Sequence, residues 1–248
     1  MLVHLNRIIL TIFISIITTL SFADEQHSHG ANTNYLNTDW SFKGIFGTFD
    51  RASLQRGYQV YQEVCAGCHS VQHLSYRNLS EKGGPEFSVE EAKAIASQFE
   101  VEDGPNSDGE MFMRPGRLSD TFVKPYPNVE ASTAANGGAY PPDMSVLTKA
   151  RKGGADYIYS LLLGYEEAPT GFELDEGVYY NKYMPGNKIK MISPLSDGLI
   201  EYSDGTSSTT AQMAKDVTAF LVWVAEPHLE SQHRMGFKSI IYLIILFI

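Results

Sequence analysis

The first stretch of apolar residues at helical spacing runs from Leu54 to Cys65. Together with Tyr58 and Tyr61, these residues recur at i, i+4, i+7 and i+11, which places them on one face of a helix. The pattern therefore predicts a helix that begins just after Asp50 and carries Cys65 near its end.

The start and the interior of this helix leave two questions open. Asp50 or Ser53 is suited to cap its N-terminus. Gly57 lies inside it and costs about 1 kcal/mol relative to alanine. Either Gly57 lets a second backbone approach closely, or the glycine is simply tolerated.

A second helix is predicted over residues 209–224. Thr209 and Gln212 have the spacing of a capping box, and Glu226-Pro227 ends the segment. The residues that line one face of this helix are apolar: Met213, Val217, Phe220, Leu221 and Val224.

The middle of the chain has little regular pattern. Short helices are expected only at residues 90–98 and at residues 155–163, where Gly164 stops the second. We therefore predict a mainly α domain with long loops. Such loops are uncommon in a compact domain unless something large packs against them, and a bound cofactor would supply that core.

Both ends of the chain differ from this domain. Residues 1–23 have one cation, an apolar run and a Ser-Phe-Ala ending, which predicts a secretory signal peptide. Residues 24–230 form the predicted exported domain. Residues 231–248 end in a nearly continuous apolar run too short to span a bilayer, and we expect the first part of a C-terminal membrane anchor. A tail that packs on the protein or lies at the membrane surface is the alternative.

Composition narrows the classes of function. The 19 Lys and Arg residues against 29 Asp and Glu residues give a net charge of −10, which disfavours nucleic acid as a partner. With two cysteines, the chain cannot contain a disulfide framework. Two free thiols in an exported protein are a liability, so they are expected to bind each other, a metal or a cofactor.

The two cysteines stand in the sequence Cys65-Ala-Gly-Cys68-His69, the C-x-x-C-H pattern of covalent haem attachment. Thiols about one helical turn apart can both reach the vinyl groups on one edge of a porphyrin. The next residue, His69, then supplies an imidazole to the iron. A redox dithiol or a zinc site is the alternative, but no third cysteine is present and a helix rather than a strand precedes the motif.

The sixth iron ligand separates an electron carrier from a haem enzyme, because enzymes leave that position open. His73 lies one turn past His69 and is expected on the same side of the haem. The remaining histidines of the mature chain lie in polar or terminal segments. Among the methionines, Met191 is the first candidate and Met184 the second, since both lie in loops before the last predicted helix.

The chain resembles the cytochrome c1 family, whose members are the haem subunits of quinol–cytochrome c reductase (cytochrome bc1) complexes. The resemblance extends from about Trp40 to the C-terminus. Besides residues 65–69, the matching blocks are residues 111–117, 136–145, 151–157, 170–171, 183–186, 191, 204–206, 214–217, 223–227 and 234–236.

The resemblance implies a c-type cytochrome fold with long loop insertions and one covalent haem c, with iron ligands His69 and Met191. It implies that Arg151 pairs with a haem propionate, a role that suits a guanidinium. Tyr157 and Asn136 match residues near the haem. Pro142 belongs to a segment along its proximal side, where a carbonyl could accept a hydrogen bond from His69.

By the same resemblance, the chain would carry single electrons from a Rieske iron–sulfur protein to a c-type cytochrome, anchored with cytochrome b in the inner cell membrane and facing the periplasm. It would have no bond-making active site of its own. Two acid-rich segments, residues 100–110 and 166–176, would attract a basic cytochrome; solvated loops are the alternative. An exported, peroxidase-like haem enzyme and a haem sensor are the rival classes.

Overall fold

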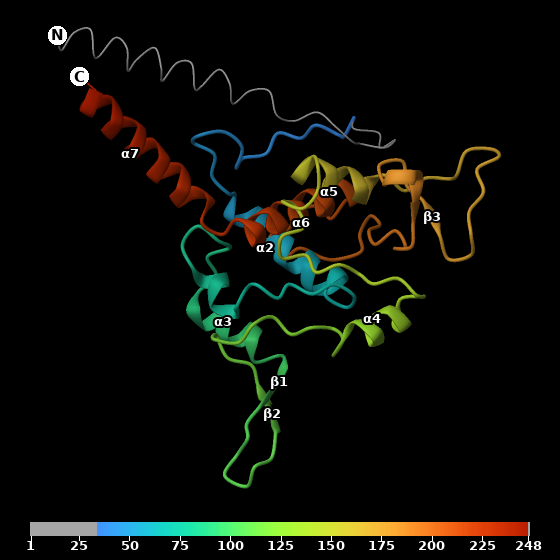
Figure 1. Cartoon of the computed structure of the whole chain (residues 1–248), viewed down its shortest axis with the longest axis horizontal. Coiled ribbons are helices and arrows are strands. Elements are labelled where there is room, and N and C mark those ends of the chain that lie inside the picture. The colour runs from blue at the N-terminus through green and yellow to red at the C-terminus, as the bar shows by residue number, and fades with distance from the viewer. Residues whose placement is uncertain (1–33, 248) are drawn as a thin grey trace, which may run out of the picture. The chain divides into compact units, whose positions relative to one another are not determined.

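The computed structural model describes residues 34–247, and the predicted signal peptide lies outside them. The described part is mainly helical with a few short strands (Figure 1). The α-helices are α2 (Arg51–Val60), α3 (Val89–Ala96), α4 (Val129–Ala135), α5 (Gly154–Leu163), α6 (Thr210–Ala225) and α7 (Leu229–Phe247). A π-helical turn (η1, Tyr61–Cys65) continues α2, and two 3-10 turns are η2 (Tyr76–Ser80) and η3 (Pro185–Asn187).

Two antiparallel hairpins complete the described secondary structure. Strand β1 (Glu100–Asp103) pairs with β2 (Phe112–Pro115), with Glu100 opposite Pro115. Strand β3 (Tyr179–Tyr180) pairs with β4 (Lys188–Ile189). The β1–β2 hairpin projects away from the helices (Figure 1). The sequence pattern indicated neither hairpin, because neither shows an alternation of buried and exposed apolar residues long enough to detect.

The two helices predicted most strongly, α2 and α6, pack against each other and form the centre of the fold. Aromatic rings fill the space around them: the Tyr61 and Phe220 rings stack with centroids 5.7 Å apart, and Tyr76 stacks on Phe122 at 4.8 Å. Helix α5 packs on α6. The core therefore surrounds the end of α2 from which the C-x-x-C-H motif begins.

The capping predictions are largely confirmed. Asp50 caps α2 by accepting hydrogen bonds from the backbone of Ala52 and Ser53. Thr209 caps α6 by accepting from the backbone N–H of Gln212. The capping box is incomplete, however, because the Gln212 side chain donates to Asp216 instead.

Asp216 is a fully buried carboxylate that ties α6 to α2. Arg56 donates to it from Nε at 2.9 Å and Ser53 from Oγ at 2.7 Å. The hydrogen bond to Asp216 raises the pKa of Arg56, against the effect of burial. A buried charge is tolerated only when it is paired in this way, so the pair fixes how the two helices align.

Gly57 lies at the crossing of these helices. A Cβ atom added there would lie 2.1 Å from the backbone oxygen of Asp216 and 2.7 Å from the Cβ of Phe220. The interpretation that Gly57 permits close approach is confirmed, and simple tolerance is wrong.

Other sequence expectations are corrected in detail. The helix expected at residues 90–98 runs over Val89–Ala96, and α4 was not predicted. The polar segment before the C-terminal apolar run forms the first turns of α7. Within residues 34–247, the structure contains no helix that combines the length and the hydropathy needed to cross a membrane.

Gly57→Ala tests the role of the helix crossing. The added methyl group meets a backbone atom that cannot move aside, so we expect a loss of unfolding free energy of about 3 kcal/mol. Urea unfolding followed by far-ultraviolet circular dichroism measures it. The matched control is Gly236→Ala, a helical glycine at which an added Cβ would meet nothing within 4 Å, expected to change stability by less than about 1 kcal/mol. Equal effects at both positions would contradict this account.

Candidate functional site

The C-x-x-C-H motif begins in the π-helical turn that follows α2. The Ala66 N–H donates to the Tyr61 carbonyl at 2.8 Å, and the His69 N–H donates to the Cys65 carbonyl at 2.9 Å. These hydrogen bonds hold Cys65 and Cys68 about one turn apart and place the His69 imidazole directly after them. Both cysteines are free, Cys65 half-buried and Cys68 exposed.

The thiol chemistry argues against the two alternatives to haem attachment. Burial raises the pKa of Cys65 to about 12, whereas a redox dithiol needs a thiol with a lowered pKa. Within residues 34–247, no group of three or more His, Cys, Asp or Glu side chains is arranged to hold a metal ion. The buried Cys65 thiol therefore does not have the lowered pKa of a redox nucleophile, and the described residues around the motif do not supply the donors of a zinc site.

His69 is oriented by one hydrogen bond. Its Nδ1 lies 2.8 Å from the carbonyl oxygen of Pro142. Because a carbonyl can only accept, Nδ1 carries the proton and the lone pair of the neutral ring resides on Nε2. Burial lowers the pKa of His69, which favours the neutral ring that can ligate iron. The hydrogen bond suggested between His69 and the proline segment is thus confirmed.

The proline segment is held against the motif by a network that sequence reasoning missed. Asp143 accepts hydrogen bonds from the Ser70 hydroxyl at 2.7 Å and from the Gln72 N–H at 3.1 Å. Ser145 accepts from the same Gln72 N–H at 2.9 Å. Burial raises the pKa of Asp143, but hydrogen bonds from Ser145 and Ser70 outweigh it and hold the pKa below its usual range. In the sequence, this network could have been recognised from Asp143, which stands two residues before Ser145.

Met191 lies two residues after β4, and one hydrogen bond holds its backbone while a second holds its neighbour Lys190. The Tyr165 hydroxyl donates to the Met191 carbonyl at 3.0 Å. The neighbouring Lys190 ammonium donates to the carbonyl of Gly137 at 3.1 Å. Because Gly137 belongs to the same loop as Pro142, the segments that carry Met191 and orient His69 are tied to a common piece of backbone.

The second methionine candidate has a different environment. The Tyr157 hydroxyl donates to the Met184 sulfur at 3.7 Å. That hydrogen bond engages one of the two lone pairs of the Met184 thioether and leaves the other free. Met191 as the first sulfur candidate therefore stays a prediction from the sequence.

Of the remaining predicted residues, Arg151 and Tyr157 lie next to each other, whereas Asn136 has a local role in α4. Burial raises the pKa of Tyr157, and the neighbouring Arg151 guanidinium opposes this effect, so these two side chains are brought together. Arg151 is exposed and donates to the carbonyl of Ala150 at 3.2 Å. Asn136 instead ends α4 and donates to the Ser132 carbonyl at 2.7 Å, a local role in its own helix.

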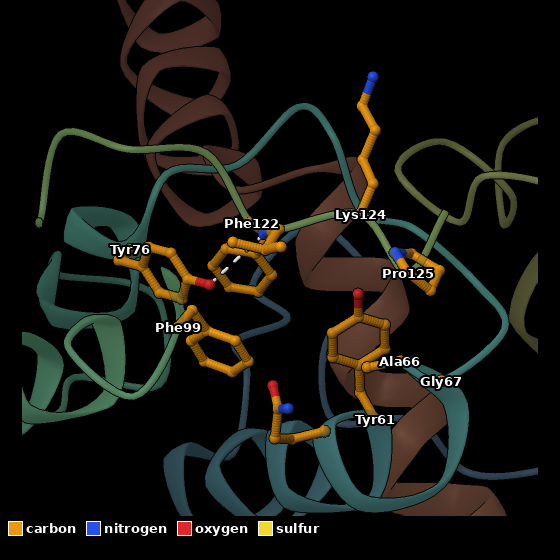
Figure 2. Close-up of a pocket in the computed structure, with 10 residues that line it drawn as sticks. Tyr61, Ala66, Gly67, Tyr76, Phe99, Phe122, Lys124 and Pro125 are labelled. Atoms are coloured by element: carbon orange, nitrogen blue, oxygen red, sulfur yellow. Dashed lines mark hydrogen bonds between the residues drawn. The ribbon is translucent and has the colours of Figure 1, made fainter. Parts of the chain in front are cut away.

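A cavity of about 320 Å³ lies beside the motif but is separate from these donors (Figure 2). Tyr61, Tyr76, Phe99 and Phe122 form its aromatic wall, with Ala66 and Gly67 at one side. None of the predicted haem or iron ligands lines it. The cavity therefore belongs to the back of the Cys65–Cys68 turn.

The residues present fit a covalently held haem. Two free thiols are spaced by one turn, a neutral imidazole presents its Nε2 lone pair, and a half-buried thioether lies in a braced loop. This donor set defines the class of a c-type cytochrome.

Comparison with known proteins identifies the family. The model of the Cytochrome C1 family matches residues 40–248, and the chain belongs to that family. A protein named cytochrome b/c1 from Bradyrhizobium diazoefficiens is 51% identical over 225 residues, covering 83% of this chain and 33% of that protein. The mitochondrial heme protein cytochrome c1-2 of Solanum tuberosum is also 51% identical over 225 residues, covering 91% of this chain and 84% of that protein.

A third relative is named for the complex itself. The mitochondrial cytochrome b-c1 complex catalytic subunit of Candida albicans is 49% identical over 216 residues, covering 87% of this chain and 73% of that protein. The chain spans one third of the length of the Bradyrhizobium relative but most of the length of the other two.

Proposed function

We propose that this chain is the haem-carrying electron-transfer subunit of a cytochrome b–c1 complex. Its membership of the Cytochrome C1 family and the names of its relatives support this proposal. The observation that carries it is the His69 imidazole, held 2.8 Å from the Pro142 carbonyl directly after two free thiols. That arrangement prepares a neutral nitrogen ligand beside two points of covalent attachment.

One haem c would be bound through thioethers at Cys65 and Cys68, and His69 and Met191 would be the side chains that hold its iron. When bound, the haem supplies a reversible one-electron couple at its iron, and a thioether ligand raises its potential. The chain makes no substrate bond. Its residues attach the group, fix the imidazole tautomer and close the sixth coordination position.

Arg151 is proposed to pair with a haem propionate. It takes part in none of the ion pairs found within residues 34–247, although its guanidinium lies beside Tyr157. Because Arg151 has no carboxylate partner among these ion pairs, its guanidinium is suited to bind a carboxylate that the cofactor supplies. Tyr157 and Asn136 would lie near the same group, Tyr157 as a neighbour of Arg151 and Asn136 through the loop that holds Pro142.

The electron donor is proposed to be a Rieske iron–sulfur protein and the acceptor a basic c-type cytochrome, with cytochrome b as the membrane partner. We place the haem domain on the periplasmic side of the inner cell membrane. Residues 1–23 would act as a signal peptide, and residues 231–248 would contribute to a membrane anchor. The apolar and exposed side chains of the last two turns of α7 support the anchor, since water is a poor environment for them.

The sixth ligand separates this function from the rival, an exported peroxidase-like haem enzyme. We expect Met191→Leu to abolish the far-red methionine–iron charge-transfer band and to lower the reduction potential by on the order of 0.2 V, a fraction of the roughly 0.8 V that axial ligands span. Optical redox titration of the purified protein measures both. The matched control is Met184→Leu, which should keep the band.

Two further measurements of the methionine–iron band test whether Met191 is the sixth ligand. Tyr165→Phe removes the hydroxyl that holds the Met191 carbonyl, and should weaken the band without abolishing it. A parent protein that already lacks the band and binds carbon monoxide readily would favour the enzyme and refute the electron carrier.

The acid-rich segments support a basic acceptor. The first is presented by the projecting β1–β2 hairpin, and its Glu102, Asp108 and Glu110 are exposed. Ion pairs consume part of this charge, as Arg114 binds Asp103 and Lys182 lies 3.5 Å from Glu166. The exposed remainder would attract cations over a distance set by ionic strength.

Neutralising three hairpin acids tests this attraction. We expect Glu102→Gln, Asp108→Asn and Glu110→Gln together to slow reduction of a basic cytochrome c roughly tenfold at low salt, and to flatten its salt dependence. Stopped-flow kinetics measures the rate. The control Glu90→Gln, Glu130→Gln and Glu201→Gln changes net charge equally at other exposed positions. If both sets slow the reaction alike, net charge and not the hairpin is responsible.

A further inference from the structure

A turn at residues 43–47 presents two apolar side chains to solvent. Ile45 and Phe46 are each 69% exposed. Gly44 has φ of +84°, and a Cβ on Gly47 would lie 2.3 Å from the Phe42 carbonyl, so both flanking positions require glycine. The Gly47 N–H donates to the Gly44 carbonyl at 3.1 Å, which closes the turn. Ile45 and Phe46 are thus held outward by a fixed backbone.

Two contacts fix this turn to the first half of α7, and a third fixes Phe49, two residues after the turn, to the same helix. The Phe46 ring meets Phe237 edge to face, with centroids 5.5 Å apart. His233 donates from Nδ1 to the Gly47 carbonyl at 3.0 Å. The Phe49 N–H donates to Glu230 at 2.9 Å. The turn and the start of α7 therefore form one structural unit.

The turn lies beside the part of α7 where the polar residues end and the apolar residues begin. After Glu230 the helix contains no acid, and its last cations are Arg234 and Lys238. From Ile240 onward the side chains are apolar and exposed. Phe237 precedes Ile240 by three residues, or about 4.5 Å of helix rise.

These lengths match the boundary layer of a bilayer. Between the ~30 Å hydrocarbon core and a total thickness of about 40–45 Å, each headgroup layer is roughly 5–8 Å thick. If the hydrocarbon begins at Ile240, then Phe237 and the Phe46 ring that contacts it lie within the headgroup layer. Lys238 then lies within the headgroup layer, about 3 Å of helix rise before Ile240, and Arg234 lies about 9 Å before it, at the outer edge of that layer, from where its long side chain can reach the lipid phosphates.

We propose that Ile45 and Phe46 form a second membrane contact, which inserts into the headgroup boundary of a lipid bilayer beside α7. This inference rests on the proposed entry of α7 into the membrane. The partner is lipid because the unit combines two outward apolar side chains, an adjoining apolar helix end, and two cations on a helix that has no acid after Glu230. Such a second contact would restrict rotation of the haem domain about its anchor.

Spin labelling in vesicles tests the contact. The full chain, with haem attached, carries Phe46→Cys, Tyr242→Cys or Val129→Cys and is reconstituted with phosphatidylcholine and phosphatidylglycerol. Val129, 51% exposed on α4, is the water-facing control, and Tyr242, 68% exposed on α7, reports the anchor. The parent chain, treated in parallel, corrects for any label on Cys65 and Cys68.

The proposal predicts that the label at residue 46 is several-fold more accessible to oxygen, and several-fold less accessible to a water-soluble nickel complex, than the label at residue 129. A lipid-exposed label at residue 242 with a water-exposed label at residue 46 overturns the contact and leaves the anchor intact. Water exposure at both positions overturns both. A label at residue 46 that is shielded from both reagents indicates a protein cover and also overturns the proposal.

A double variant gives an independent readout. Ile45→Ser with Phe46→Ser should weaken vesicle partitioning on the order of tenfold, because the apolar area that enters the boundary is lost. Far-ultraviolet circular dichroism establishes that the variant is folded. Partitioning equal to that of the parent chain would contradict the contact.

Discussion

The hydrogen bond between His69 Nδ1 and the Pro142 carbonyl is the constraint on which the proposed chemistry depends. It sets the tautomer of the imidazole and leaves Nε2 as the nitrogen that can bind a metal. A histidine free to rotate would pay an entropic cost on ligation and would exchange tautomers. The remaining architecture can be understood as the means by which a helix end and a loop 73 residues later are held at this distance.

Two layers of structure keep that distance. The inner layer is the buried pair of Arg56 and Asp216, which aligns α2 with α6 and so fixes where the Cys65 turn begins. The outer layer is the set of hydrogen bonds from Ser70 and Gln72 to Asp143, which fastens the proline segment to the motif. Both layers consist of buried or half-buried polar groups with hydrogen-bond partners, an arrangement that specifies one geometry more strictly than apolar packing does.

The sequence predicted those parts of the fold that local rules control. Asp50, Thr209 and Gly164 mark the helix ends where capping and termination rules place them. Gly57 left a close helix crossing and simple tolerance both open, and the structure decided for the crossing. The Pro142 carbonyl beside His69 was implied by the family resemblance and not by the spacing of the C-x-x-C-H motif.

The sequence could not predict contacts that join distant segments. Tyr165 and Lys190 look like ordinary loop residues until the fold brings them to the Met191 carbonyl and to Gly137. The π-helical turn was also missed, since an apolar face at i, i+4 and i+7 is equally consistent with a regular α-helix. The first turns of α7 resemble a polar linker because the residues that fix them, Glu230 and His233, bind the loop before α2 rather than their own helix.

The most direct test of the account is whether haem is joined to this chain at Cys65 and Cys68. Acidified acetone extracts haem that is held by iron ligation alone, whereas thioether bonds survive it. The account predicts that the colour remains with the denatured polypeptide, and that mass spectrometry of a protease digest finds one haem on the peptide containing residues 65–69. Haem that passes entirely into the acetone, or a peptide that retains both free thiols, would contradict it.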